Sequence, residues 1–383
     1  MNEENTNVQP PATPPEVPTE DAHVQGTPKS KKGLIVTLAV VAVIVLAAGG
    51  FGIWKMMANK PTPKAAVKPV RIGLSLDTLK IQRWSDERDI MAKKATAMGA
   101  TLTTLVAEGD NQVQVDQIDN FITQKVDVII LVSADATGVA PAIERAHKAG
   151  IKVIDYDRLN IKADSDLYMS FDSVKVGVQA ADYVVKAIPA TVKVPKIAFL
   201  GGSTTDNNAF LVKDGAMSIL DPIVKSGKAT LVFDKFITDW SPSEAYTEFK
   251  KFLDGGGQVD AVVTSYDGLA FGAIRALHEK GLDGKVPVSG QNGELQAIQR
   301  IAAGTQTMTA YKPGKPLAEK TIALAIDMAN GKKITTTGVT NNKQRDVPSY
   351  LFDPIPVTKD NIKDTVIKDG TFTAAQIYGA GGQ

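Results

Sequence analysis

The sequence contains no cysteine, and this absence excludes several kinds of protein at once. The chain has no disulfide framework, no thiolate metal site, no cysteine nucleophile and no cysteine that could carry a lipid. The redox compartment stays open, because a cysteine-free protein tolerates either condition. Histidine is also scarce, and His23, His147 and His278 are too scattered in the sequence to predict a metal site. We therefore expect neither a metal ion nor a cofactor.

An excess of charge of one sign is missing as well. The 383 residues include 43 Lys and Arg and 42 Asp and Glu, which gives a formal net charge of +1. Because there is no large basic field, we expect no nucleic-acid partner. A hydrophobic content of 43% and a charged content of 22% are typical of a globular protein. The length is sufficient for two ordinary domains with additional segments.

One long apolar run lies near the N-terminus. Residues 1–30 are rich in Pro, Glu, Thr and Asn without apolar periodicity, which predicts a disordered tail. Residues 33–54 carry no charge and, as a helix, would measure about 33 Å, close to the thickness of a bilayer core. Trp54 stands at the far end, where interfacial aromatic residues are common. We expect 33–54 to be a transmembrane anchor and the Pro- and Lys-containing stretch 55–68 to be a linker.

Two properties of this anchor are left open by the sequence. A cleaved signal peptide is the alternative interpretation, because residues 47–50 are all Ala or Gly. Against it stand the length of the apolar run and the long tail before it. Lysines occur on both sides of the run, so the positive-inside rule barely decides the orientation.

From Val70 onward, apolar strand patterns alternate with helical ones, which predicts parallel sheets. About ten such units fall into two groups, so we expect an α/β fold of two doubly wound, Rossmann-like lobes with a cleft between them. A single eight-fold barrel is the alternative. The expected strands include 70–76, 101–107, 126–132, 152–155, 167–170, 196–200, 230–236, 261–265, 286–290 and 307–311. Residues 335–383 show no clear pattern and are expected to be irregular.

Polar and aromatic side chains follow the ends of many of these strands. In open α/β sheets the ligand lies outside the carboxyl ends of the strands, so we expect these side chains to converge in the cleft. The candidate binding residues are Lys80, Arg83, Trp84, Asp157, Arg158, Asp206, Asn208, Trp240, Tyr266, Asp267, Asn292 and Lys312.

This set is rich in planar hydrogen-bonding groups and poor in nucleophile–base pairs. Asp, Asn and Arg can each bridge two neighbouring sugar hydroxyls, and Trp offers a flat apolar face to the C–H side of a pyranose ring. Each residue alone also has a structural interpretation. Trp84 fits a core residue, Asp157 and Arg158 a surface ion pair, and Asp206 with Asn208 a helix cap. The occurrence of sugar-suited residues at most strand ends favours a monosaccharide site.

Segments spread from Val70 to Gly370 resemble a known family. Among them are RWSDERDI, YDR, GGSTTDNNA, SGQ and RIAAGTQTMTAYKP. They are similar to the periplasmic D-xylose-binding proteins of ABC sugar importers, a family of the ribose/galactose-binding group with the type I periplasmic-binding fold. That fold has two lobes joined by a hinge of three crossing segments. It implies an N-terminal lobe of 69–174 plus 313–345 and a C-terminal lobe of 175–312 plus 346–378.

The resemblance also assigns roles to individual residues. Arg83 and Trp84 match the Arg-Trp pair that contacts the sugar from the first lobe. Asp157 and Arg158 match the next contact from that lobe. The remaining matches are two hinge-side polar contacts, a stacking Trp and a Lys before a crossing segment, namely Asp206, Asn208, Trp240 and Lys312.

Two positions depart from the family pattern. Tyr266 stands where the family has Asn in a Ser-Asn-Asp loop, and Asn292 stands where it has Asp after Ser-Gly-Gln. Losing a carboxylate and gaining a phenol changes both the hydrogen-bond pattern and the pocket volume, so the identity of the sugar stays open. The anchor also departs, since the family is usually free in the periplasm after signal cleavage.

These observations predict a membrane-tethered, extracellular substrate-binding protein of an ABC sugar importer, and not an enzyme. The expected partners are a monosaccharide such as xylose or a similar pentose, ABC permease subunits, and the membrane through the N-terminal helix. The folded part is expected to be monomeric and to lie on the extracellular or periplasmic side of the cell membrane. The alternatives are the sensing module of a signalling system and a glycan-modifying enzyme with a carboxylate pair.

Overall fold

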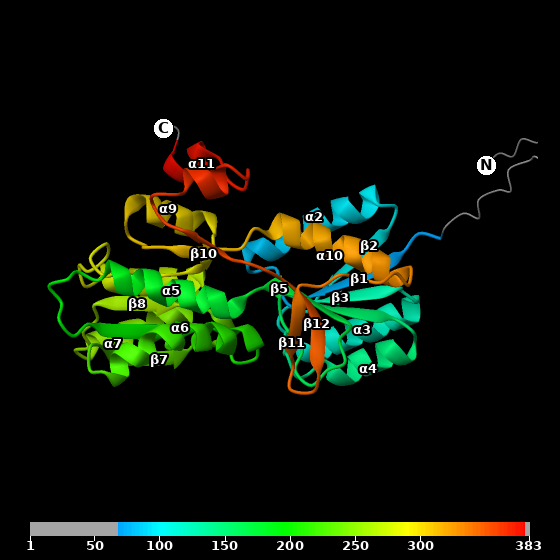
Figure 1. Cartoon of the computed structure of the whole chain (residues 1–383), viewed down its shortest axis with the longest axis horizontal. Helices are drawn as coiled ribbons and strands as arrows, with labels where there is room; N and C mark the ends of the chain where they lie inside the picture. The colour runs from blue at the N-terminus through cyan, green and yellow to red at the C-terminus, as the bar shows by residue number, and fades with distance from the viewer. Residues whose placement is uncertain (1–67, 380–383) are drawn as a thin grey trace, which may run out of the picture. The chain divides into compact units, whose positions relative to one another are not determined.

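The computed structural model describes residues 68–379, which form two α/β lobes (Figure 1). The predicted tail 1–30, the predicted span 33–54 and nearly all of the predicted linker 55–68 lie outside the described residues. None of the helices within 68–379 combines the length and the apolar character needed to cross a bilayer.

The first lobe is built on a seven-stranded sheet with the order β11-β12-β5-β4-β3-β1-β2. Its neighbouring strands pair in parallel, except that β11 and β12 form an antiparallel hairpin. The central strand β3 is buried along its whole length, as a strand covered on both faces must be. The strands are β1 (Arg71–Leu76), β2 (Thr101–Val106), β3 (Val128–Leu131), β4 (Lys152–Tyr156), β5 (Leu167–Phe171), β11 (Gly338–Asn341) and β12 (Asp346–Phe352).

Helices cover both faces of this sheet. On one face α2 (Gln82–Ala97) and α10 (Gly314–Ala329) pack on the strand residues whose side chains point that way, such as Leu74 and Ile130. On the other face α3 (Asn111–Gln124) and α4 (Ala140–Lys148) cover the alternate residues, such as Ile129. The alternation along β3 therefore divides its apolar side chains between two cores.

The second lobe has two three-stranded sheets, β7-β6-β8 and β13-β10-β9, which are linked by a bridge between Val262 and Val288. Its strands are β6 (Lys196–Gly201), β7 (Thr230–Phe236), β8 (Ala261–Thr264), β9 (Gln291–Asn292), β10 (Thr309–Tyr311) and β13 (Ile355–Val357). Its helices are α5 (Ser173–Ala187), α6 (Asn207–Lys225), α7 (Pro242–Asp254), α8 (Asp267–His278), α9 (Leu295–Ala303) and α11 (Ala374–Tyr378), with short turns η1 (Thr238–Trp240) and η2 (Lys363–Ile367).

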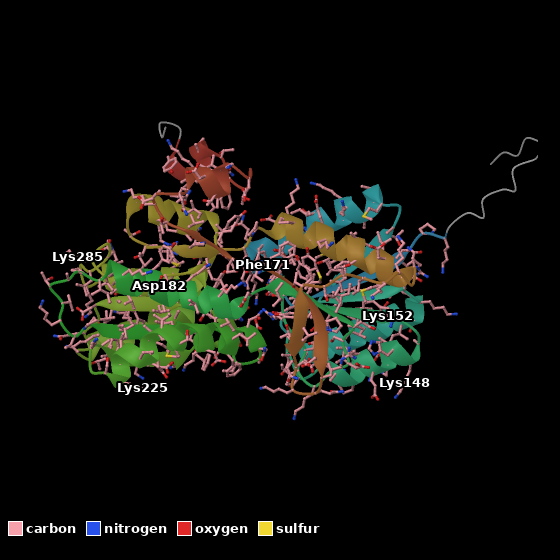
Figure 2. All side chains as sticks on the ribbon, viewed as in Figure 1. Lys148, Lys152, Phe171, Asp182, Lys225 and Lys285 are labelled. Atoms are coloured by element: carbon pink, nitrogen blue, oxygen red, sulfur yellow. The ribbon has the colours of Figure 1, made fainter. Side chains whose placement is uncertain are left out.

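The chain crosses between the lobes three times, after β5, after β10 and after β12. The first and third crossings lie side by side, because the amide of Asp172 donates to the carbonyl of Phe352 at 2.9 Å and Lys175 pairs with Asp353 at 2.6 Å. Phe171 is buried where the chain enters the first crossing. Exposed lysines such as Lys148, Lys225 and Lys285 instead extend from the outer surfaces of the lobes (Figure 2).

Two sequence-based expectations about the C-terminal part are wrong. Residues 346–378 were assigned to the second lobe, but β12 pairs in parallel with β5 of the first lobe. Residues 335–383 were expected to be irregular, but the described part contains β11, β12, β13, η2 and α11. Pro348 within β12 obscured the strand, because proline lacks the amide hydrogen that a central strand uses. The other predicted lobe limits stay predictions.

Two glycines allow α5 and α6 to approach each other closely. A Cβ atom at Gly177 would lie 1.9 Å from the carbonyl oxygen of Val212, and one at Gly215 would lie 2.0 Å from that of Val174. We expect Gly177→Ala to lower the free energy of unfolding by about 1–3 kcal/mol, because the backbone of α6 must move away. Denaturant unfolding measures this, with Gly338→Ala as the control, since nothing lies within 4 Å of that site. Equal effects of the two substitutions would contradict the packing described here.

Candidate functional site

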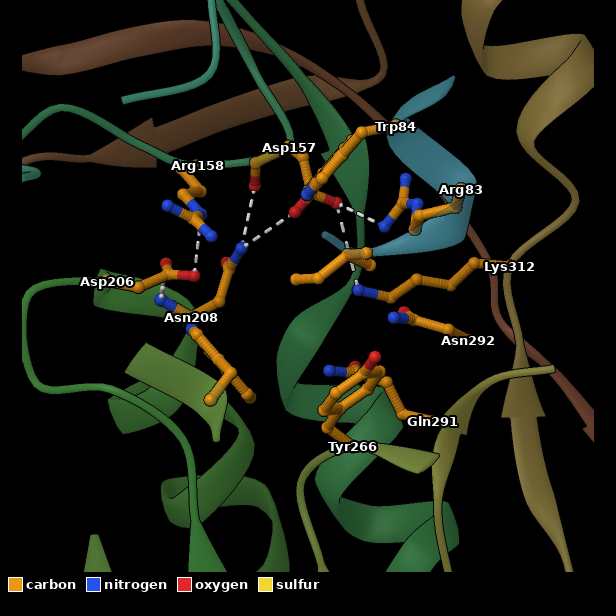
Figure 3. Close-up of a pocket in the computed structure, with 12 residues that line it drawn as sticks. Arg83, Trp84, Asp157, Arg158, Asp206, Asn208, Tyr266, Gln291, Asn292 and Lys312 are labelled. Carbon is orange, nitrogen blue, oxygen red and sulfur yellow. Dashed lines mark hydrogen bonds and ion pairs between the residues drawn. The ribbon is translucent and has the colours of Figure 1, made fainter. Parts of the chain in front are cut away.

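A pocket lies between the lobes, outside the carboxyl ends of their strands (Figure 3). It is lined by Ile81, Arg83, Trp84, Asp157 and Arg158 from the first lobe, by Asp206, Asn208, Trp240, Tyr266, Gln291 and Asn292 from the second, and by Lys312 at a crossing. Ten of the twelve residues singled out from the sequence are in this lining. That they bind a ligand stays a prediction, but the structure brings them together.

Two of the predicted residues are not in the lining. The side chain of Lys80 is exposed to solvent. Asp267 is fully buried behind the pocket, where its carboxylate accepts hydrogen bonds from the amides of Gly293 and Glu294 at 2.9 and 3.0 Å and from the hydroxyl of Thr309 at 3.0 Å. Asp267 therefore fixes the loop after β9 from behind. Its position directly after Tyr266 explains why the sequence placed it in the site.

Two lining residues were missed, Ile81 and Gln291. Ile81 has no polar group that would have marked it. Gln291 directly precedes the predicted residue Asn292, and its amide nitrogen donates to the carbonyl of Ser265 at 2.7 Å. A search for residues after strand ends could have found Gln291, because it lies within the short strand that carries Asn292.

Asp157 is the centre of positive charge recognition in the pocket. Its carboxylate accepts a hydrogen bond from Nη1 of Arg83 at 2.9 Å and lies 3.8 Å from Nζ of Lys312. Burial alone would raise the pKa of Asp157, but Arg83, Lys312 and Arg158 outweigh it and lower the pKa below its usual value. Asp157 is therefore ionised near neutral pH and balances two buried cations.

Arg158 connects the two lobes. Its Nη1 donates to Asp77 at 2.8 Å and to the carbonyl of Ser133 at 2.7 Å, both in the first lobe. Its Nε lies 2.9 Å from the carboxylate of Asp206 in the second lobe, at an angle that makes an ion pair but not a hydrogen bond. Burial raises the pKa of Asp206, and Arg158 opposes that rise. The pair is thus an interlobe contact within the pocket.

Glu87 holds Arg83 in place and was not identified from the sequence. It lies one helical turn after Arg83 on α2, accepts from Nε of that residue at 3.0 Å, and also accepts from the hydroxyl of Tyr156 at 2.7 Å. Burial raises the pKa of Glu87 against the opposing effect of Arg83. With Glu87 behind it and Asp157 in front, the guanidinium has little rotational freedom.

Asn208 forms a second contact between the lobes. Its amide nitrogen donates to the carbonyl oxygen of Asp157 at 2.8 Å, while Asp206 caps α6 by accepting from the backbone amide of Asn208 at 2.8 Å. Close by, the amide of Ala136 in the first lobe donates to the carbonyl of Thr205 in the second at 2.9 Å. The lobes therefore touch directly through backbone and side-chain atoms.

Four buried polar atoms of the lining have no hydrogen-bond partner within the described residues. They are the indole nitrogens of Trp84 and Trp240 and the amide oxygens of Gln291 and Asn292. A buried polar atom without a partner costs about 1–3 kcal/mol, and each such atom in a native structure calls for an explanation. Two donors and two acceptors facing a shared pocket are what a small polar ligand with several hydroxyl groups would satisfy.

Backbone strain concentrates in the same place. Asp157, Trp240 and Asn292 have positive φ angles of 62°, 55° and 100°. Residues other than glycine adopt this region at a cost, and such strain clusters at functional sites. The Trp240 ring also lies directly over Gly202, where a Cβ atom would come within 2.1–2.4 Å of it. Trp240 is thus held in one position by its backbone and by the floor beneath it.

The free volume of the pocket is small. It amounts to about 20 Å³, which is room for a single water molecule. Arg83, Lys312 and Asp157 occupy the centre with their own ion pairs. A ligand of any greater size therefore enters only when the side chains rearrange or the lobes move apart.

Two doubly wound lobes, three crossings and a polar pocket between the lobes define the class of bilobal solute receptors. A family model described as a periplasmic binding protein domain matches residues 72–333. The chain belongs to this periplasmic binding protein family, as the resemblance in its sequence predicted.

Relatives narrow the comparison. The chain is 43% identical to a D-xylose-binding periplasmic protein of Haemophilus influenzae over 312 residues, which cover 81% of this chain and 93% of that protein. It is also 43% identical to the D-xylose-binding periplasmic protein of Escherichia coli, covering 80% of this chain and 92% of that protein. These relatives are named as binding proteins, and the chain is a binding protein of the same family and not an enzyme.

A solved structure agrees with this assignment. An ABC transporter solute-binding protein from Clostridium phytofermentans with bound β-D-glucose superposes with a TM-score of 0.74 at 27% identity, covering 80% of this chain and 99% of that chain. The type I periplasmic-binding fold predicted from the sequence is confirmed. The expected membrane span lies outside the residues that these comparisons and the described structure address.

Proposed function

We propose that the protein is the membrane-tethered, extracellular substrate-binding component of an ABC sugar importer and that it binds one pentose, D-xylose or a similar sugar, in the interlobe pocket. The carrying observation is the set of four unpartnered donors and acceptors in the lining, beside three cations and their carboxylates. The names of the relatives support the same ligand class.

The chemistry of the lining suits a polyol. Each sugar hydroxyl is at once a donor and an acceptor, and the forked groups of Arg83, Asp157 and Asn208 can each engage two neighbouring hydroxyls. Hydrogen bonds to charged groups contribute about 1.5–3 kcal/mol each, whereas a misplaced hydroxyl leaves a buried partner unpaired. The indoles of Trp84 and Trp240 supply flat surfaces for the C–H faces of a ring.

Binding would proceed by movement of the lobes about the three crossings. The interlobe contacts of Arg158 with Asp206 and of Asn208 with Asp157 must break for the pocket to open. A sugar that enters then bridges the same two walls, so that closure buries it. We propose that the ABC permease recognises the closed arrangement, because closing changes the relative position of surfaces on both lobes.

The tether and the assembly state follow from the sequence and not from the described residues. The uncharged stretch 33–54 supports a retained anchor that keeps the receptor beside its permease. One chain supplies both walls of the pocket, which supports a monomer. Membrane fractionation of cells that express the whole chain tests the anchor, and recovery of the protein only in the soluble fraction would contradict it.

Isothermal titration calorimetry on residues 68–383 tests the proposed ligand. We expect saturable binding of D-xylose with one sugar per chain, and binding heat that disappears when the permuted control ligand glycerol replaces the sugar at the same concentration. The control variant is Asp119→Ala, an exposed residue of the first lobe that pairs with Arg145 away from the pocket. Absence of binding heat with every pentose and hexose in a panel would sink the proposal.

A further inference from the structure

Tyr266 differs from the other large residues of the lining in how it uses its polar group. Its hydroxyl donates to the carboxylate of Glu294 at 2.7 Å, behind the pocket wall. Burial raises the pKa of Tyr266 well above its usual value, so the phenol stays protonated and continues to donate. The indoles of Trp84 and Trp240, in contrast, keep their N–H groups free. Tyr266 therefore gives the pocket its bulk without offering a free hydrogen-bonding group.

The ring of Tyr266 is held firmly. It meets the Trp240 ring edge-on, with 6.2 Å between centroids and 86° between planes. It also lies over Gly268, where a Cβ atom would come within 2.3 Å of it. Its partner Glu294 is fixed in turn, because its backbone amide donates to the buried Asp267. The ring cannot move aside without breaking this chain of contacts.

A second, much larger cavity lies beyond the Tyr266–Glu294 pair. It has a free volume of about 740 Å³, and Glu294 lines it, whereas Tyr266 lines the small pocket. Arg83, Asn292 and Lys312 line both. The hydrogen bond between Tyr266 and Glu294 therefore spans part of the wall that separates the two spaces (Figure 3).

We propose that Tyr266 sets the size limit of the pocket and excludes sugars that carry a hydroxymethyl group on the pyranose ring. The inference depends on the function proposed above, since it concerns which monosaccharides the same pocket accepts. A pentopyranose has only hydrogens at the carbon where a hexopyranose has the hydroxymethyl group. The added group needs both volume and a hydrogen-bond partner, and the Tyr266 ring denies it both. Removing the ring opens space toward the second cavity.

D-Xylose and D-glucose are the matched probes, because D-glucopyranose is D-xylopyranose with a hydroxymethyl group at the fifth carbon. Calorimetry gives the ratio of their dissociation constants for each variant. We expect the unsubstituted protein to bind D-xylose at least about 10-fold more tightly than D-glucose, which is in the range for one steric mismatch in a closed pocket. Tyr266→Ala is expected to reduce this ratio at least about 10-fold through tighter D-glucose binding.

Three further variants separate bulk from other effects. Tyr266→Phe keeps the ring and loses the bond to Glu294, so the selectivity ratio is expected to stay within about 3-fold whatever the change in affinity. Tyr246→Ala removes a tyrosine–glutamate pair outside the pocket, in which the Tyr246 hydroxyl donates to Glu279 at 2.6 Å, and should leave the ratio unchanged. Tyr266→Leu replaces the alanine variant if thermal unfolding shows that the latter does not fold.

Each outcome bears on one of the two proposals. An unchanged ratio in Tyr266→Ala or Tyr266→Leu overturns the size limit, and so does an equally large shift in Tyr266→Phe, which would assign selectivity to the hydrogen bond. If the unsubstituted protein binds D-glucose as tightly as D-xylose, the size limit fails and the sugar-binding function stands. If it binds no monosaccharide, the proposed function itself fails.

Discussion

Replacing Asp157 by asparagine is expected to lower the free energy of unfolding by about 3 kcal/mol or more, because removal of one partner from a buried ion pair leaves the other charge uncompensated. Asp157 is 4% exposed and faces both Arg83 and Lys312. Asparagine keeps the shape of the side chain and tolerates the positive φ of 62°, so the change removes little besides the charge. Denaturant unfolding at neutral pH measures the effect.

The control for this prediction is an exposed ion pair of the same lobe. Asp119 accepts from Nε and Nη2 of Arg145, both at 2.8 Å, and the two side chains are 45% and 43% exposed. Because exposed pairs contribute at most about 1 kcal/mol, Asp119→Asn should have a small effect. Similar losses in the two variants would show that the Asp157 charge is not stabilising the lobe junction.

The effect of Asp157→Asn should also depend on pH. The pKa of Asp157 is lower in the folded state than its usual value near 4, so the unfolded chain takes up the proton first as the pH falls. The stability that the carboxylate contributes is then complete above about pH 4 and is lost as the pH falls through the lowered folded value. The difference between the unsubstituted protein and the variant is expected to shrink below about pH 4.

Trp240→Ala is expected to weaken monosaccharide binding at least about 10-fold, because it removes both a stacking surface and an unpartnered N–H donor. Trp240→Phe keeps a flat ring without the donor and should give an intermediate loss. Both variants are measured by calorimetry with the sugar that the unsubstituted protein binds, after circular dichroism has shown that each variant is folded.

An aromatic residue outside the pocket serves as the control for Trp240. Phe210 lies on α6 of the same lobe and is 42% exposed, so Phe210→Ala should leave the dissociation constant unchanged within about 2-fold. An affinity of Trp240→Ala equal to that of the unsubstituted protein would mean that the ligand binds elsewhere.

Much of this site was predictable from the sequence because one rule places it. Parallel strands end at the same edge of a sheet, so the residues after those ends, such as Arg158, Asp206 and Tyr266, had to meet wherever two such edges face each other. The rule uses only strand positions, which the apolar runs mark clearly. It places residues well and says nothing of where each side chain points, which is why Asp267 was assigned to the lining although it faces the opposite way.

The parts that could not be predicted depend on contacts between distant segments. Glu87 and Asp77 look like ordinary acidic residues in sequence, and only the fold shows that they hold Arg83 and Arg158. The third crossing was placed too early because β12 gains its strand character from pairing with β5 and not from its own composition. Local patterns predict elements, whereas the partner of an edge strand is decided by the assembled sheet.

The ion pairs that fill the empty pocket make every ligand a competitor of the protein itself. A sugar that binds Asp157 or Arg158 must take over atoms that already have partners, so the measured affinity is a difference between two nearly equal networks. A substitution at the lobe junction that loosens the native pairing without touching the ligand would strengthen binding, in the way that releasing a spring makes a door easier to push. Selection could thus tune such a receptor to scarce or plentiful nutrient through residues that never meet it.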